Sequence, residues 1–524
     1  MADHGFWSYA NRDAEALALV DPEERSWTRG ELHAACNRIV GALREIGLQR
    51  GDAVALDSPN CAEFFAVYLA CTQAGYYLVP INWHLAPPEV AYIVQDSEAK
   101  AFIGHERLAE VCVKAADEID FPSEARLAIG EIAGFRSLEE AMSGHSPDAP
   151  EDRSAGAVMN YTSGTTGRPK GVKRDLAPAE LEPDLIMGLF GGFLGMFGVE
   201  AGGDGVYICG SPLYHTAVLL QSAAALHWGH PVVLMDKWEP EEMLRLIEKY
   251  RCTTSHMVPT QFHRLLLLPE ERRSKYDVSS TRHMLHAAAP CPPEIKRRMI
   301  EWWGESIWEY YAATEGGGTM VAAADWLEHP GTVGKAWPNA EIRIFDDDGK
   351  ALPQGEIGTV YILMMDQAKF EYKDDAEKTR KNRIVADDGL VFFTAGDVGY
   401  LDPDGYLFLC DRKIDMIISG GANIYPAEIE NELLNHPKVG DVAVFGIPNE
   451  DWGEEIKAVI EPAPGVEAGD DLTQDIMAFC QERLARFKQP RSIDYTHEMP
   501  RDPNGKLYKR KLRDPYWEGH ERAI

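Results

Sequence analysis

The sequence predicts an α/β protein: a large N-terminal domain of stacked, mostly parallel sheets with helices, and a small α+β C-terminal domain. Three observations predict this architecture. Strand-like and helix-like segments alternate through the first four-fifths of the chain, which is typical of parallel sheets joined by helices. After Val333 the pattern changes to short strands joined by tight turns. The chain has 524 residues, which favours two or more domains over a single core.

Apolar patterning defines the elements of the first part of the chain. Residues 61–75, CAEFFAVYLACTQAG, are predominantly apolar and end at a glycine, which predicts a buried helix. Residues 87–97 begin with two prolines, which favour the first turn of a helix. Short apolar runs at 52–58, 76–82 and 100–105 predict the strands around these helices.

The alternation resumes at residue 205 and continues to residue 311. Residues 239–250 carry acidic residues in their first turn and apolar residues at Met243, Ile247 and Tyr250, which predicts an amphipathic helix. The other predicted segments are the strands 205–210, 231–236, 252–258, 281–287 and 306–311 and the helices 217–229, 260–268 and 292–304.

Beyond Val333 the sequence predicts antiparallel pairing. Residues 341–363 and 390–415 read as hairpins, with turns at DDDGK and PQGE. The segments that follow predict a compact α+β unit the size of a small domain. We place the boundary at CDRKID, which divides the chain into a large domain, 1–411, and a small domain, 412–524.

Composition excludes several classes of function. The net charge is −32, from 52 basic and 84 acidic residues, so nucleic acid is not expected as a partner. The nine cysteines contain no C-x-x-C pair, which argues against zinc ribbons, redox motifs and a disulfide framework. No secretory signal is visible at the N-terminus, and the apolar run 185–199 is too short for a transmembrane segment. We therefore expect a cytoplasmic protein.

Residues 161–172, YTSGTTGRPKGV, are too polar and too rich in glycine for a core strand or helix. Glycine and small hydroxyl residues let successive backbone N–H groups converge on one anion, and the hydroxyls add donors. Arg168 and Lys170 add positive charge. The stretch predicts a phosphate-binding loop that differs from the G-x-x-x-x-G-K-[ST] pattern. The alternative interpretation is a flexible surface linker.

This loop resembles the phosphate-binding signature of the adenylate-forming enzymes, which include acyl-CoA synthetases, aryl-CoA ligases, peptide-synthetase adenylation domains and beetle luciferases. Four further segments resemble signatures of the family and follow in the same order: HAAAP at 286–290, YYAATEGG at 310–317, residues 395–430 and PRDPNGKLYKRKLR at 500–513. The resemblance therefore covers nearly the whole chain. The resemblance implies a distorted β-barrel in the large domain and a mobile small domain with a hinge at 412–415.

The implied reaction has two steps. A carboxylate attacks the α-phosphate of ATP and gives acyl-AMP and pyrophosphate; a thiol, usually that of CoA, then displaces AMP. By resemblance, the β- and γ-phosphates are held by Thr162, Ser163, Gly164, Thr165, Thr166 and Lys170. Glu315, which follows Thr314, is the implied Mg²⁺ ligand, and a single carboxylate suits phosphate-bound Mg²⁺. The alternative for Glu315 is a solvated loop residue.

The nucleoside is expected to lie between two other motifs. Tyr311 would stack on the adenine, with Ala288 and Ala289 on the opposite side. Asp397 and Arg412 resemble the pair that binds the ribose hydroxyls. Two alternatives stay open: Tyr311 as an ordinary buried side chain, and a mutual salt bridge between Asp397 and Arg412.

Three residues concern the acid substrate. Ala312 and His286 depart from the residues common in the family, on the acyl side of the expected pocket, and so leave the substrate open. His215, in SPLYHTA, resembles a residue that borders the carboxylate, with an ordinary loop histidine as the alternative. Together with Lys506, Glu315 and Thr162, His215 completes the predicted catalytic set.

Lys506 follows the turn DPNG and is expected to bridge the carboxylate and the α-phosphate. The basic residues after it, Lys509 to Lys511, are interpreted as a solvated face. Because Lys506 and the phosphate loop lie in different domains, the resemblance implies that the small domain rotates between the two steps. The pivot is Ile414. After rotation, the pantetheine channel would be lined by Ser419, Gly420 and Gly421.

A large hydrophobic acid is the expected substrate. The run 185–199 places Gly188, Gly191 or Gly192, Gly195 and Gly198 at helical spacing, which predicts either close helix packing or room for a bulky acyl chain or ring system. The segment 256–262 is the other expected wall. The acyl acceptor is left open between CoA and an acyl carrier protein. A luciferase-type oxygenase and a non-catalytic nucleotide-binding relative are alternative functions for the chain. A homodimer is one expectation for the assembly.

Overall fold

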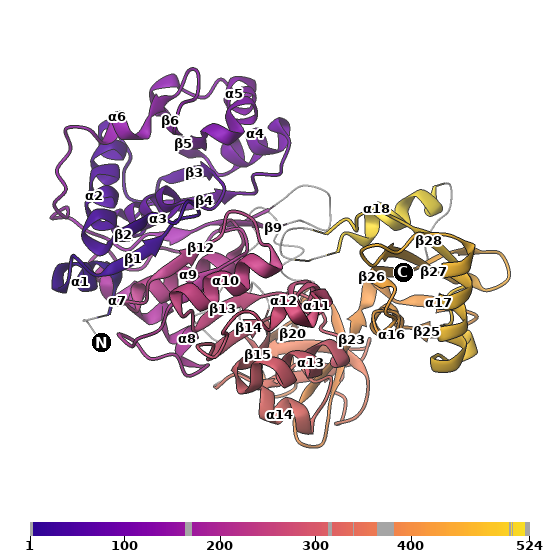
Figure 1. Cartoon of the computed structure of the whole chain (residues 1–524). Helices are drawn as coiled ribbons and strands as arrows, with labels where there is room; N and C mark the ends of the chain where they lie inside the picture. The colour runs from indigo at the N-terminus through magenta and orange to yellow at the C-terminus, as the bar shows by residue number, and fades with distance from the viewer. Residues whose placement is uncertain are drawn as a thin grey trace. The chain divides into compact units, whose positions relative to one another are not determined.

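Figure 1 shows a computed structural model of the chain, which describes residues 4–162, 170–312, 317–338, 340–363, 382–501, 505 and 507–518. Two compact units are distinguished in it. One contains residues 4–256 and 270–284; the other contains residues 257–269 and the described residues from 285 onwards. Each is described by itself below. The domain boundary at 411/412 stays a prediction.

The first unit contains a sheet in which all six strands are parallel. Their order is β7-β6-β5-β3-β4-β8. The strands are β3 (Ala53–Asp57), β4 (Tyr77–Ile81), β5 (Ala99–His105), β6 (Arg126–Ile129), β7 (Arg136–Ser137) and β8 (Ala157–Val158). Helices α4 (Pro87–Asp96) and α5 (Ala109–Glu118) lie beside this sheet (Figure 1). Side chains such as Val90 and Ala115 share one core with Val79 and Phe102 of the sheet.

Helix α3 (Ala62–Ala74) is the buried helix that the sequence predicts. Nearly every residue of it is inaccessible to solvent, which explains why it is apolar on all sides. It ends at Gly75, whose φ of 76° is the left-handed conformation that glycine adopts at little cost. The Gly75 N–H donates to the carbonyl of Cys71.

A nine-stranded sheet has the order β17-β16-β15-β14-β13-β11-β12-β1-β2. Strand β11 is parallel to β12 and β13, and β1 is parallel to β12, whereas β15–β16, β16–β17 and β1–β2 are antiparallel. The strands are β1 (Leu17–Val20), β2 (Ser26–Thr28), β11 (Tyr207–Cys209), β12 (Val232–Leu234), β13 (Thr254–Met257), β14 (His283–His286), β15 (Ile307–Ala312), β16 (Gly318–Ala322) and β17 (Lys335–Ala336).

Several helices begin where the sequence provides a local start signal, such as a capping residue or a proline in the first turn. The Thr28 side chain accepts from the Glu31 N–H at 3.1 Å, and Glu31 accepts from the Thr28 N–H at 2.8 Å, which forms a capping box at the start of α2. The remaining helices are α1 (Phe6–Arg12), α2 (Arg29–Ile46), α6 (Leu138–Met142), α7 (Pro183–Phe190), α8 (Gly192–Gly195), α9 (Thr216–His227), α10 (Pro240–Tyr250), α11 (Pro259–Leu267), α12 (Glu270–Arg273), α13 (Pro293–Trp303), α14 (Ala323–Glu328), α16 (Pro426–Leu433), α17 (Asp470–Arg483) and α18 (Lys509–Arg513).

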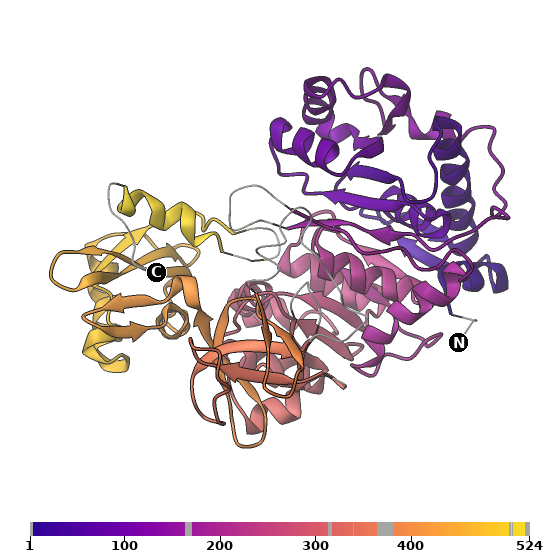
Figure 2. The same cartoon turned by 180° about the vertical axis from the view of Figure 1, so that it is seen from behind.

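The predicted hairpins form a separate antiparallel sheet, in the salmon and orange part of Figure 2. Its order is β20-β21-β19-β22-β23, with β18 also paired to β19. The strands are β18 (Ile342–Phe345), β19 (Gly358–Leu363), β20 (Arg383–Val385), β21 (Val391–Phe393), β22 (Asp397–Leu401) and β23 (Leu407–Arg412). Within the described residues this sheet is open, because β20 and β23 are not paired, so it differs from the predicted distorted barrel.

The C-terminal part is the predicted α+β unit. The strands β24 (Ile417–Ser419), β25 (Ala422–Ile424), β26 (Val439–Asn449), β27 (Gly453–Pro462) and β28 (Ser492–Tyr495) form one sheet. Helices α16 and α17 pack on it through a core that includes Ile429, Leu433, Ile476 and Cys480. The fold class predicted from sequence is therefore confirmed. Within the described part of the chain, every helix is too short or too polar to cross a lipid bilayer.

An ionisable side chain ends the central strand of the parallel sheet. Asp57 is 0% exposed, and burial raises its pKa to about 7. The Cys112 thiol donates to its Oδ2 at 3.7 Å, and Oδ1 has no hydrogen-bond partner among the described residues. A carboxyl group in this setting is stable in its protonated form.

Asp57→Asn should therefore stabilise the protein at pH 8. The folded-state pKa lies above the unfolded value, so proton binding favours the folded state at low pH, and this contribution is lost as pH rises from about 4 to 7. An amide has no proton to lose. We expect urea unfolding to give the variant a higher free energy of unfolding than the parent at pH 8 and no such advantage at pH 4. An equal difference at both pH values would contradict this account.

Candidate active site

The predicted phosphate-binding loop is closed by a short hairpin. Strands β9 (Asn160–Thr162) and β10 (Lys170–Val172) are antiparallel, with Thr162 opposite Lys170. The Tyr161 hydroxyl donates to Asp96 at 2.6 Å, and burial, with a contribution from this bond, raises the Tyr161 pKa. A Cβ atom on Gly171 would lie only 3.0 Å from the Tyr161 ring, so glycine lets the ring cross the hairpin. The two ends of the loop are thereby held together.

The other predicted phosphate-binding residues lie outside the described residues. These are Ser163, Gly164, Thr165 and Thr166. Thr314, Glu315 and Lys506 also lie outside them. The structure therefore describes the flanks of these three segments, and their roles stay predictions.

The adenine-side segment follows β14 directly. Ala288 has a φ of 72°, one of five non-glycine residues with positive φ among the described residues. A left-handed alanine costs about 1 kcal/mol or more, and such strain concentrates at functional sites. Ala288 is exposed and Ala289 is half-buried. The surrounding structure therefore holds the Ala288 backbone in a conformation that is unfavourable for alanine.

Three predicted nucleoside-binding residues come together in the structure. The Tyr311 hydroxyl, from β15, donates to Asp397 Oδ2 at 2.6 Å. Asp397 on β22 stands opposite Arg412 on β23, and Arg412 Nε lies 3.5 Å from Asp397 Oδ1. The mutual ion pair that the sequence analysis held open is thus present. Arg412 is half exposed while Asp397 is largely buried, so the pair keeps a solvent-facing donor.

His215 occupies the N-cap position of α9. Its ring lies 4.2 Å from that of Tyr214, centroid to centroid, and the Tyr214 hydroxyl is 3.4 Å from His84 Nδ1. Burial lowers the pKa of His84. The rings of Tyr214, His215 and His84 therefore lie together at the start of α9. This position is compatible with the predicted contact between His215 and the substrate carboxylate.

The predicted pantetheine segment is a tight turn between β24 and β25. Gly420 and Gly421 have φ values of 57° and 80°, as a two-residue hairpin with a primed turn requires. A Cβ atom on Gly420 would lie 2.5 Å from the Trp452 ring, and the Gly420 N–H donates to the Trp452 carbonyl at 2.8 Å. Trp452 is 58% exposed. Sequence reasoning missed it, although an aromatic residue within the polar stretch NEDWGEE was a usable signal.

The predicted hinge segment contacts the C-terminal helix α18. Arg412 is followed by a short 3₁₀ turn, Lys413–Asp415, and Asp415 lies 3.5 Å from Arg513 of α18. The Lys509 side chain is only 14% exposed and pairs with Glu430 at 2.8 Å. The interpretation of Lys509 as part of a solvated face is therefore wrong, because two carboxylates, those of Glu430 and Asp411, draw it into the interior.

The glycine-rich run 185–199 packs closely against neighbouring side chains. Close packing is one of the two alternatives that the sequence predicts for it. Cβ atoms on Gly191 and Gly195 would collide with the Trp228 ring, and one on Gly188 would collide with the His4 carbonyl. Trp228 Nε1 donates to the Gly188 carbonyl at 2.9 Å. Gly192 differs, since nothing lies within 4 Å of its Cβ position. Most of the glycines thus serve packing.

A buried charge cluster lies beneath the adenine-side residues. Lys296 of α13 donates to Glu309 of β15 at 2.6 Å, and both are almost inaccessible to solvent. His286, at the end of β14, is 0% exposed; its Nε2 lies 3.7 Å from Glu309, and its ring packs edge-on against Phe262. The expectation that His286 touches the acyl side of a pocket is not supported, because the strand places it in the core. In the segment 256–262 most side chains are likewise buried.

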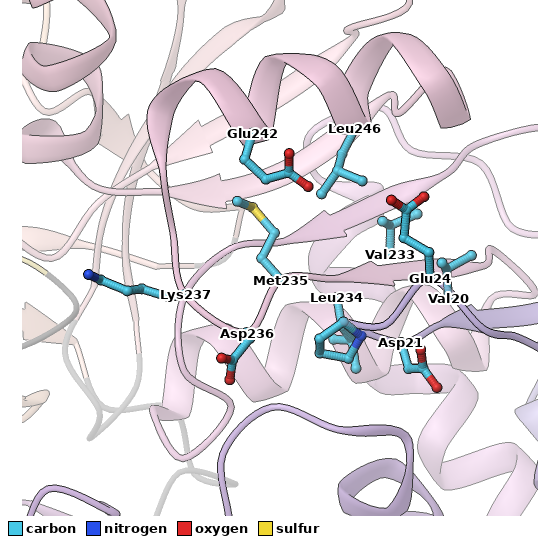
Figure 3. Close-up of a pocket in the computed structure, with 11 residues that line it drawn as sticks. Val20, Asp21, Glu24, Val233, Leu234, Met235, Asp236, Lys237, Glu242 and Leu246 are labelled. Carbon is cyan, nitrogen blue, oxygen red and sulfur yellow. The ribbon is translucent and has the colours of Figure 1, made fainter.

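Figure 3 shows a separate hollow of about 240 Å³ in the first unit. It lies beside the ends of β1 and β12, and none of the predicted site residues lines it. Its charged groups are already engaged: Asp236 pairs with Arg107 at 2.5 Å, and Glu24 pairs with Arg245 at 2.6 Å. The one basic residue among its lining residues, Lys237, has a side chain that is 82% exposed and lies 3.4 Å from Glu239.

Comparison with known proteins decides the family. The AMP-binding enzyme family matches residues 6–364, and the C-terminal domain of AMP-binding enzymes matches residues 428–506. The chain belongs to the family of AMP-binding enzymes. The identification from the sequence motifs is therefore confirmed.

Relatives extend over almost the full chain. A long-chain-fatty-acid–CoA ligase from Mycobacterium tuberculosis is 32% identical, over 95% of this chain and 95% of its own length. A feruloyl-CoA synthase from an Amycolatopsis species is 33% identical, over 93% of each. A fatty acid–[acyl-carrier-protein] ligase from Streptomyces coeruleorubidus is 30% identical, over 96% of this chain and 94% of its own. These names confirm the assignment to the acid–thiol ligases.

A solved structure gives the same fold. The ATP-bound MatB protein from Rhodopseudomonas palustris is 29% identical, with a TM-score of 0.79 over 99% of this chain and all of that chain. A relative with this fold thus binds ATP.

We expect Lys296→Met to lower the free energy of unfolding by about 3–5 kcal/mol, because it leaves the Glu309 carboxylate buried without its partner. Urea unfolding at pH 7 measures this. The double variant Lys296→Met/Glu309→Leu should recover part of the loss, since it removes both charges. Lys114→Met, which breaks an exposed pair with Glu110, is the control and should change stability by less than about 0.5 kcal/mol. A single-variant loss no larger than that of the control would contradict the buried-pair account.

Proposed function

We propose that this enzyme is an AMP-forming acyl-CoA synthetase that activates a hydrophobic carboxylic acid with ATP and transfers the acyl group to CoA. The observation that carries the proposal is the cluster of Tyr311, Asp397 and Arg412, which meets at one place from three strands in a chain of the AMP-binding family. An aromatic face, a carboxylate and a guanidinium are the groups needed for a base and two ribose hydroxyls.

In the first step, a carboxylate oxygen of the acid attacks the α-phosphorus of ATP, and the bond to pyrophosphate breaks. Negative charge accumulates on the phosphate oxygens, so fixed donors have the largest effect. Thr162 and Lys170 face each other across the hairpin that closes the phosphate loop, which supports their assignment to the β- and γ-phosphates. The motif residues 163–166 complete this set by sequence alone, and Lys506, also assigned by sequence alone, would bridge the carboxylate and the α-phosphate. His215 would border the carboxylate.

In the second step, the CoA sulfur attacks the acyl carbon, and the bond to AMP breaks. The turn at Ser419, Gly420 and Gly421 would line the path of the thiol. Trp452 lies against Gly420 and is exposed, which supports adding it to this surface. A flat apolar side chain there would cover an extended thiol arm.

Glu315 is the residue proposed to hold Mg²⁺, with ATP supplying the other ligands. A carboxylate and phosphate oxygens form a donor set that suits this ion. When bound, the ion would neutralise charge on the phosphates.

The acid itself is proposed only as a class. Relatives act on long-chain fatty acids and on ferulate, so the shared property is an extended hydrophobic or aromatic body. The relative from Streptomyces coeruleorubidus transfers to an acyl carrier protein, which makes a carrier protein the second candidate acceptor. Cytoplasmic location and a homodimer remain expectations from the sequence.

A screen tests the proposal. Purified protein is incubated with ATP, Mg²⁺ and a panel of short, long-chain, aromatic and polycyclic acids, and pyrophosphate release is measured; CoA or a phosphopantetheinylated carrier protein is then added, and the thioester is identified by mass. Acid-dependent pyrophosphate release followed by acyl-CoA is the expected result. Transfer only to the carrier protein would select the second acceptor, and no pyrophosphate with any acid would refute the proposal.

Lys506→Ala should slow acyl-AMP formation by roughly 10²–10³, the scale of losing one fixed donor at a developing anion. Acyl transfer to CoA from chemically supplied acyl-AMP should be nearly unchanged if the lysine acts only in the first step. The two half-reactions are measured separately, because overall turnover reports only the slower one. An equal decrease in both would remove the step-specific role of Lys506.

A further inference from the structure

Arg501 lies at the base of the turn that leads to Lys506. It forms a bridge with Leu507 across the turn, in antiparallel pairing. Its Nη1 donates to the Gly505 carbonyl at 2.6 Å. Gly505 is buried and has a φ of 77°, a conformation that favours glycine. One side chain therefore contacts the residue just before Lys506, and its own backbone pairs with the residue just after it.

The Arg501 side chain is held from the other side by Asp441. Nε lies 2.6 Å from Asp441 Oδ2 and Nη2 lies 2.7 Å from Oδ1, which is the bidentate geometry that orients a guanidinium. Asp441 is 6% exposed. The register of β26 against β27 shifts between Val439 and Asp441, an irregularity of the kind that re-aims a side chain. The strand is thus bent where this carboxylate leaves it.

Two further contacts stabilise the two ends of the turn. The Tyr508 N–H donates to the Pro500 carbonyl at 2.8 Å, and the Met499 N–H donates to Glu461 at 2.7 Å. Leu507 packs against a small core that contains Phe445 and Met499. Arg501 is also close to the carboxylates of Glu430 and Glu461, and these acidic groups help to hold its charge in place. Hydrogen bonds and apolar contacts therefore hold the residues on both sides of the turn.

We propose that Arg501 and Asp441 are positioning residues for Lys506. Asp441 orients the guanidinium, the guanidinium holds the Gly505 carbonyl, and the backbone entering Lys506 is thereby fixed. The inference rests on the proposed function, in which Lys506 acts on the carboxylate and the α-phosphate. A displacement of about 1 Å in such a group can cost 10²-fold in rate. Neither residue is expected to touch substrate.

The test measures the two half-reactions separately for Arg501→Met, Arg501→Lys, Asp441→Asn and the double variant Arg501→Met/Asp441→Asn. We expect Arg501→Met to slow acyl-AMP formation by roughly 10–100-fold and to leave acyl transfer from supplied acyl-AMP within about twofold, since it disturbs only the group used in the first step. Arg501→Lys keeps the charge but loses the bidentate pair, so it should recover part of the rate. The double variant should be no slower than Arg501→Met, because both changes break one chain of contacts.

Lys438→Met is the matched control, because it breaks an exposed ion pair with Asp475 in the same domain, at 2.6 Å in the structure. It should leave both half-reactions unchanged. Equal slowing of both half-reactions by Arg501→Met, with no recovery in Arg501→Lys, would indicate a purely structural role and overturn the proposal. Lys506→Ala, measured alongside, separates the two levels: if it slows acyl-AMP formation and Arg501→Met does not, the positioning role fails and the proposed function stands. If the parent enzyme forms no acyl-AMP with any acid, the proposed function fails.

Discussion

Parallel strands cannot be joined by a tight turn, and this constraint arranges most of the molecule. Each parallel strand needs a crossover, here usually a helix, before the next strand can begin. The crossovers cover the faces of the sheet and are buried in turn, as α3 shows by being apolar on all sides. The loops that follow the strands are consequently left at the edges. The segment after β14 that carries Ala288 is one such loop.

The candidate site depends on polar side chains that fix one another. Tyr311, Asp397 and Arg412 come from three strands and hold each other through one hydrogen bond and one ion pair. Arg501 and Asp441 do the same beneath the lysine turn. In both places a carboxylate with little exposure orients a longer side chain. Preorganisation of this kind matters for a reaction whose rate depends on donors already in place.

Several details of the site show how tertiary contacts override local interpretation. A row of glycines on one helix face is compatible with a substrate channel and with close packing. At Gly191 and Gly195 the space beside the backbone is filled by the Trp228 ring, so these glycines serve packing. Lys509 stands in a basic run that reads as a solvated face, yet it is drawn inward by Glu430. His286 ends a strand beside a buried Lys296–Glu309 pair, and so belongs to the core. In each case the deciding partner is distant in sequence.

The sequence by itself determined the class of the fold, the order of the elements within 52–105 and 205–311, and the family, because these depend on local periodicity, on turn residues and on motifs that are contiguous in the chain. It also indicated Tyr311, Asp397 and Arg412 as members of one site. Only the tertiary structure decided that these three side chains meet, that Ala288 is held in a left-handed conformation, that the antiparallel sheet stays open in its described part, and that Arg501 reaches the Gly505 carbonyl. Such contacts join residues that are up to a hundred positions apart or depend on the geometry of a turn, and periodicity along the chain carries no information about either.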